Sequence, residues 1–82
     1  MTIEKLQAVL HASPFQPFRI YMADGRSVHV PHRDFISYAP SGRTVIVEHQ
    51  DDTHSVLDLL LMTELKIGNG RASRTRKPKG AA

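Results

Sequence analysis

Two histidines lie three residues apart in the run His29-Val-Pro-His32, and Asp34 follows closely. Imidazole and carboxylate groups are ordinary zinc ligands, and a zinc site takes three or four ligands. Residues three apart on a regular strand face opposite sides, so both imidazoles reach one ion only if the chain bends at Pro31. Because Asp34 is the only obvious third ligand, the pattern favours polar residues at a strand end. We expect no metal and no cofactor.

Histidine, serine and aspartate are all present, but no local motif arranges them for nucleophilic catalysis. The sequence has no nucleophile elbow, no glycine-rich phosphate loop and no histidine pair at helical spacing. Ser41-Gly42 and Asp24-Gly25 have the composition of turns. A domain this small also has little room for the enclosed pocket that most enzymes use. We therefore expect no catalytic residues, no small-molecule substrate and no enzymatic activity.

The charges divide the chain into two parts. Its 82 residues carry 11 Lys and Arg against 8 Asp and Glu, a formal net charge of +3. All eight acids and six of the cations lie in residues 1–67, whereas residues 68–82 carry five cations and no acid. Cations without neighbouring acids can neutralise phosphates, so the tail is the predicted RNA- or DNA-binding segment. The predicted nucleic-acid-binding residues are Arg71, Arg74, Arg76, Lys77 and Lys79.

The same tail composition also suits a terminus that only keeps a protein soluble, and this alternative stays open. After Gly68-Asn69-Gly70 no apolar residue larger than alanine follows, so we expect residues 68–82 to be disordered in isolation. The arginines of residues 1–67 are interspersed with acids, which favours a solvated surface over a basic patch. The aromatic residues Tyr21, Phe35 and Tyr38 are candidates for stacking on bases.

The composition excludes several classes of protein. The chain has no cysteine, so it has no disulfide and no thiolate metal site, which fits a reducing cytoplasm. No run approaches the roughly 18 apolar residues of a membrane helix, and residues 1–12 are not typical of a signal peptide. We expect a cytoplasmic protein without a membrane-spanning segment.

The elements that position these residues follow from the spacing of apolar side chains. Residues 2–12 show helical spacing and end before Ser13-Pro14, where the proline disfavours the helical conformation. Phe18, Ile20 and Met22 then alternate with polar residues, and Asp24-Gly25 supplies a tight hairpin turn. Pro31, which cannot donate a ladder hydrogen bond, is expected to end the second strand of this hairpin or to mark a bulge or bend.

The remaining elements are shorter. Strands are predicted over residues 35–38, 44–49, 54–58 and 62–67, and residues 59–61 form a helical or 3₁₀ turn. In the last strand we expect regular alternation, which places Met62, Glu64 and Lys66 on one face. A helix followed by five or six short strands predicts an α+β domain over residues 1–67. Its expected form is a strongly bent antiparallel sheet or a small barrel.

Several short runs resemble a group of short, uncharacterised bacterial proteins. They are PFxPFxI at residues 14–20, ADGR at 23–26, VPHxxF at 30–35, PSGRTV at 40–45 and LDLLLMTE at 57–64. The resemblance covers about residues 1–67 and leaves out the tail. It implies a common domain but no particular function.

The order of the predicted elements also resembles the Sm-like and SH3-like small barrels. In Sm-like proteins the closing strand pairs with a neighbouring subunit and builds a ring, so the resemblance implies a homo-oligomer. Their RNA site does not transfer to this chain, which lacks the glycine that bends their second strand. Val56-Leu57-Asp58 stands where the bacterial Sm-like chaperone has Tyr-Lys-His, and an aspartate repels phosphate.

The run VLDLLLM at residues 56–62 contributes more apolar surface than one small core absorbs. It predicts a homo-oligomer contact formed by Leu57, Leu59, Leu60 and Leu61. The sequence therefore favours a non-enzymatic, oligomerising domain whose basic tail binds RNA or DNA weakly. The alternative is a protein–protein interaction or regulatory module with a passive, solubilising tail.

Overall fold

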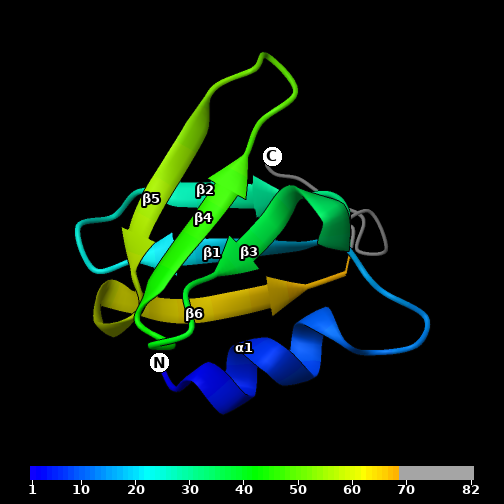
Figure 1. Cartoon of the computed structure of the whole chain (residues 1–82), viewed down its shortest axis with the longest axis horizontal. Coiled ribbons are helices and arrows are strands. Elements are labelled where there is room, and N and C mark those ends of the chain that lie inside the picture. Colours follow the sequence, from blue (N-terminus) through cyan, green and yellow to red (C-terminus); the bar gives the residue numbers. More distant parts are fainter. Residues whose placement is uncertain (69–82) are drawn as a thin grey trace, which may run out of the picture.

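The computed structural model describes residues 1–68, which form one α-helix and six strands (Figure 1). The helix α1 spans Ile3–Leu10, and the strands are β1 (Phe18–Met22), β2 (Ser27–Val30), β3 (Ile36–Tyr38), β4 (Thr44–Glu48), β5 (His54–Asp58) and β6 (Met62–Ile67). Two single 3₁₀ turns, η1 (Arg33–Phe35) and η2 (Leu59–Leu61), follow β2 and β5. No helix among residues 1–68 is long and apolar enough to cross a membrane.

The strands form two antiparallel three-stranded sheets, in the orders β2-β1-β6 and β3-β4-β5. Figure 1 shows the second sheet running diagonally in front of the first. The predicted α+β class and the predicted order of the helix and strands are therefore confirmed. The turn η1 was not predicted, and it contains Phe35, with which the third strand was expected to begin. The described strands do not close into a barrel, because Pro31 and the turn η1 separate β2 from β3, and a proline cannot donate a ladder hydrogen bond.

The helix α1 is shorter than its predicted range of residues 2–12. The Thr2 hydroxyl accepts from the Lys5 backbone N–H at 3.4 Å and caps the first turn. Leu6 and Leu10, four residues apart, are buried, so one face of the helix covers the core. Figure 1 shows α1 next to β6, and Val9 and Ile67 line one shallow hollow between them.

The predicted β1–β2 hairpin is confirmed. Along β1 the side chains alternate between buried and half-buried, so Phe18, Ile20 and Met22 all point into the core. Gly25 adopts φ +93°, a left-handed conformation that side chains with a Cβ rarely adopt. The Asp24 carboxylate accepts from the Arg26 backbone N–H at 3.0 Å and closes the turn.

The regular alternation expected in β6 is wrong. Tyr21 pairs with Glu64 but Met22 pairs with Met62, so a β-bulge leaves Thr63 as an extra residue. Met62 is buried and Leu65 is half-buried against the same core, although the two residues are three apart. The bulge therefore gives both apolar residues a place inside, which strict alternation cannot do.

The core lies between the two sheets and under α1. Its buried side chains are all hydrophobic, and no polar or charged side chain among residues 1–68 is buried. They are Leu6, Leu10, Phe18, Ile20, Met22, Val30, Ile36, Val45, Val47, Leu57, Leu59 and Met62. Every polar or ionisable side chain of residues 1–68 is consequently exposed or only partly buried.

Candidate functional site

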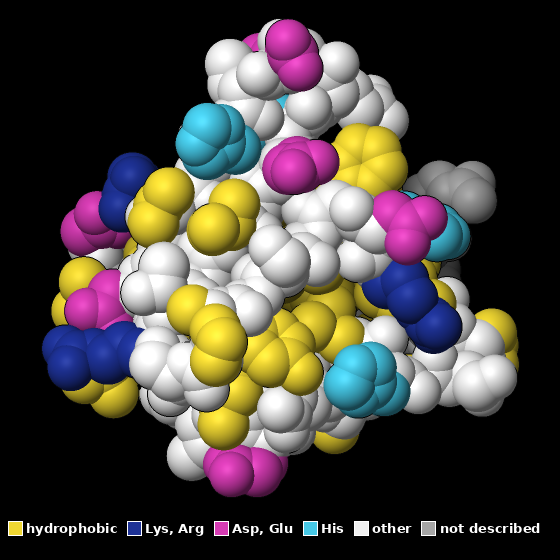
Figure 2. Space-filling view, in the orientation of Figure 1, with side chains coloured by type: hydrophobic (Ala, Val, Ile, Leu, Met, Phe, Trp, Pro, Cys, Tyr) yellow, Lys and Arg dark blue, Asp and Glu magenta, His cyan; other side chains and the backbone are white. Residues whose placement is uncertain are grey.

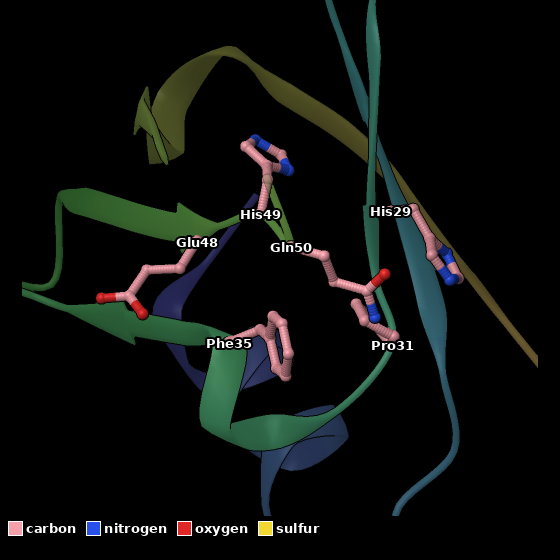
Figure 3. A pocket seen from close by; sticks show the side chains of 6 residues that line it. All are labelled: His29, Pro31, Phe35, Glu48, His49 and Gln50. Atoms are coloured by element: carbon pink, nitrogen blue, oxygen red, sulfur yellow. The ribbon is translucent and has the colours of Figure 1, made fainter. Parts of the chain in front are cut away.

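A hollow of about 330 Å³ lies where the ends of β2 and β4 meet the turn η1. Its lining residues are His29, Pro31, Phe35, Glu48, His49 and Gln50, and Figure 3 shows their side chains. The hollow thus combines two imidazoles with a carboxylate, the groups used in acid–base catalysis and in metal binding. Its chemistry depends on whether these groups point to a common centre.

The polar groups of this hollow diverge. In Figure 3 the Glu48 carboxylate points to one side, and the ring of His29 points away from the other labelled side chains. Gln50 extends toward Pro31 between them. Residues 1–68 contain no group of three or more His, Cys, Asp or Glu that could hold a metal ion. The polar groups of the hollow therefore do not point to a common centre.

One serine–histidine contact lies beside the hollow. The Nε2 atom of His49 is 2.9 Å from the Oγ atom of Ser55. A catalytic pair of this kind needs a third group that orients the imidazole. No carboxylate of residues 1–68 lies within 4.0 Å of a ring nitrogen of His49. The contact therefore links the residue that follows β4 to β5 without forming a triad.

The two histidines singled out in the sequence have separate roles. The Nδ1 atom of His32 accepts from the Asp34 backbone N–H at 3.3 Å and caps the turn η1. Its ring also lies 5.7 Å from the ring of Phe15, measured between centroids. His29 lies opposite Arg19 on the exposed face of β2. The two side chains thus make different contacts, His32 with the turn η1 and Phe15, and His29 on the outer face of β2.

Of the three candidate stacking aromatics, Tyr21 has the most suitable position. The Tyr38 hydroxyl accepts from the Gln7 side-chain amide at 3.1 Å, and its ring packs against the core. Phe35 is half-buried in the hollow described above. Tyr21 is half-buried on the face of β1 that points away from the core.

Asp58 organises the chain after β5. Its carboxylate accepts from the Leu60 backbone N–H at 3.0 Å and lies 3.4 Å from the Nε atom of Arg43. The hydrogen bond from Leu60, followed by that from Arg43, holds the pKa of Asp58 below its ordinary value. This aspartate caps the leucine turn η2, which explains its presence structurally.

The predicted oligomer residues divide between the core and the surface. Leu57 and Leu59 are buried within the chain itself, so they are not available to a second subunit. Leu60 is 62% exposed and Leu61 53% exposed. Val56, at the centre of β5, is 63% exposed, and Figure 2 shows hydrophobic side chains over β4 and β5. The large hydrophobic side chains exposed in residues 1–68 are Val56, Leu60, Leu61 and Ile67. The first three lie in β5 and the turn that follows it, and we call them the leucine-turn surface.

The strand register also assembles a row of nitrogen-bearing side chains that the sequence analysis did not identify. Arg19 of β1 pairs with His29 of β2 on one side and with Lys66 of β6 on the other. The alternation of β1 showed that Arg19 faces outward. No local signal, however, shows that a strand more than 40 residues later lies beside it.

The predicted nucleic-acid-binding residues Arg71, Arg74, Arg76, Lys77 and Lys79 lie outside the described residues 1–68. Comparison with models of protein families, with curated proteins and with solved structures finds no match to this chain. Its function is therefore inferred from its own charges and surfaces.

Proposed function

We propose that this protein is a non-enzymatic, oligomerising domain of the cytoplasm whose basic tail binds RNA or DNA through charge. The observation that carries the proposal is the separation of charge along the chain. Residues 68–82 carry five cations and no acid, whereas residues 1–67 hold all eight acids. Such a tail attracts phosphates without sequence preference, and binding releases the counterions that phosphates condense.

Assembly rests on the leucine-turn surface. The strand β5 lies at the edge of the β3-β4-β5 sheet, and Val56 lies at its centre. Leu60 and Leu61 extend the apolar area into the following turn. An edge strand with exposed apolar side chains can pair with a second copy of the same chain. Several tails held together then gain avidity from their high local concentration.

An Sm-like architecture is part of this proposal. The helix precedes the strands, and β5, the turn η2 and β6 follow one another at the end of the described chain. Both β5 and β6 are edge strands, in different sheets. In Sm-like proteins the closing strand pairs with a neighbouring subunit. Their position as edge strands is compatible with the same kind of contact.

The test compares the full chain with a tail-neutral variant that carries Gln in place of Arg71, Arg74, Arg76, Lys77 and Lys79. Fluorescence anisotropy measures binding to labelled single-stranded RNA and duplex DNA from about 50 to about 200 mM salt. If all five cations engage, the slope of log K against log salt is about −3.5 for single strands and about −4.5 for duplex. Unchanged binding by the tail-neutral variant would overturn the proposal.

The alternative function is a protein–protein interaction or regulatory module with a passive tail. The leucine-turn surface favours it, because exposed apolar residues of this kind also suit a different protein partner. Under this alternative neither the full chain nor the tail-neutral variant binds nucleic acid. Substitution of Leu60 then abolishes partner binding, and tail neutralisation leaves it unchanged.

A further inference from the structure

The outer face of the β2-β1-β6 sheet carries a row of basic side chains across all three strands. His29, Arg19 and Lys66 lie in register on neighbouring strands. Since paired strands are about 4.8 Å apart, the row extends over about 10 Å. Arg19 lies on the non-core side of β1, and His29 and Lys66 are exposed. The row therefore presents its nitrogen atoms to the solvent side of the sheet.

The two permanent cations of this row are not engaged by acids of the described chain. No carboxylate of residues 1–68 lies within 4.0 Å of the side-chain nitrogens of Arg19 or Lys66. The Arg19 guanidinium donates to the Ser27 hydroxyl at 3.1 Å, which fixes its orientation over the sheet. Glu64 of β6 lies opposite Tyr21, in the next outward row of the ladder. Both cations thus remain free to hold an anion.

A hollow joins the basic row to an aromatic ring. Arg19, Tyr21, His29 and Lys66 all line one depression of about 240 Å³ on this face. Tyr21 occupies the next outward position along β1 and is half-buried. A cation beside an aromatic ring matches the alternation of phosphate and base in a single strand.

We propose that this outer face binds single-stranded nucleic acid, with Arg19 and Lys66 holding phosphates and Tyr21 stacking on a base. The inference rests on the proposed function and deepens it by giving the folded domain its own contact. Lys66 lies two residues before Gly68, where the described part of the chain ends, and the tail cations begin at Arg71. One strand can therefore contact the sheet and the tail together. A duplex is excluded from the stacking contact because its bases already stack on one another.

The test uses the full chain and anisotropy with a labelled single-stranded oligouridylate across a salt series. The face variant Arg19→Gln/Lys66→Gln removes two phosphate contacts, so its log–log salt slope becomes shallower by about 1.4. The control variant Lys5→Gln/Arg26→Gln removes the same charge from exposed positions outside the row and keeps the slope. If the double variant unfolds, Lys66→Gln alone repeats the test, and its log–log salt slope is expected to become shallower by about 0.7.

The stacking contact has its own readout. Tyr21→Leu weakens binding about fivefold or more and leaves the salt slope unchanged, because stacking releases no counterions. Tyr21→Phe keeps the aromatic face and restores binding. Thermal unfolding of each variant confirms that the sheet is intact. The inference would be overturned if oligoglutamate displaced the labelled oligouridylate as well as unlabelled oligouridylate does and if Tyr21→Leu had no effect on binding. That result would identify a surface for acidic peptides.

The outcomes separate this inference from the function on which it rests. If the tail-neutral variant loses binding while the face variant equals its control, the tail proposal stands and the face proposal is wrong. If the face variant loses binding while the tail-neutral variant retains it, the reverse holds. If both variants bind as well as the unmodified chain, both proposals are wrong.

Discussion

Met62 of β6 pairs with Met22 of β1 across a bulge that separates this pair from the neighbouring pairing of Tyr21 with Glu64. The bulge turns Met62 into the core, where 1% of its surface is exposed. It also places the outward residues Glu64 and Lys66 in register with Tyr21 and Arg19. This one bulge thus determines both the packing of Met62 in the core and the composition of the outer face.

The burial of Met62 predicts a large loss of stability in Met62→Ala. Removing a buried methionine side chain costs about 2–5 kcal/mol of unfolding free energy. The buried apolar atoms are lost from the core, and the cavity that they leave adds a further cost. Urea unfolding followed by circular dichroism measures the change. The matched control is Glu64→Ala in the same strand, which is exposed and is expected to change stability by about 0.5 kcal/mol or less. Equal effects of the two substitutions would show that Met62 lies on the face of Glu64, as strict alternation demands.

This bulge shows which features the sequence could predict. The β1–β2 hairpin was predictable because its signals are local: alternation on both sides of Asp24-Gly25. The bulge was not, because it depends on how β6 meets a strand more than 40 residues earlier. The burial of Leu57 and Leu59 likewise depends on which apolar residues the core takes up. Composition alone identified an apolar excess without showing which leucines stay exposed.

The same limit applies to the candidate site. The five tail cations are visible in the sequence because they lie close together along it. Arg19 and Lys66 are 47 residues apart and meet only through strand pairing. In the sequence each cation has acids nearby, so a solvated surface was the better interpretation. The pairing register of the strands, which the sequence does not reveal, places these two cations side by side in one row.

The left-handed backbone of Gly25 predicts a cost for Gly25→Val. A Cβ at this position meets no atom within 4 Å, so crowding contributes nothing, and the cost comes from φ +93° alone. A β-branched residue there destabilises the fold by about 1–2 kcal/mol, measured by thermal or urea unfolding. Gly25→Asn is the control, because asparagine tolerates this region and loses less stability. An unchanged unfolding midpoint in Gly25→Val would show that the turn is assigned wrongly.

Asp58 predicts part of the acid sensitivity of the fold. Its pKa is lowered by the hydrogen bond from Leu60 and by Arg43, so the unfolded chain takes up this proton at a higher pH than the folded chain. The stabilisation is complete above the ordinary carboxyl pKa of 3.8 and is lost as pH falls through the lowered pKa. Asp58→Asn is therefore less stable than the unmodified chain at about pH 6, and the difference shrinks toward about pH 2.

Urea midpoints measured at a series of pH values test this expectation. The pKa values of Asp24 and Asp51 are also lowered, by hydrogen bonds within their turns. The unmodified chain and Asp58→Asn therefore both lose stability in acid, and only the difference in stability between these two proteins reports on Asp58. Arg43→Gln removes one cause of the lowered pKa and is expected to reduce the pH dependence in part. A difference between the two proteins that stays constant with pH would show that Asp58 stabilises the turn through packing alone.

The leucine-turn surface predicts assembly in solution that depends on Leu60 and Leu61. Both side chains are more than half exposed, so Leu60→Lys/Leu61→Lys removes apolar contact area at little cost to the folded monomer. Sedimentation equilibrium at increasing protein concentration is expected to show oligomers of the unmodified chain and monomers of this variant. Leu57→Ala is the contrasting variant. Its side chain is buried, so it lowers unfolding stability by about 2–5 kcal/mol. A monomer at the highest concentration for the unmodified chain would remove assembly, and with it the avidity of clustered tails, from the proposed function.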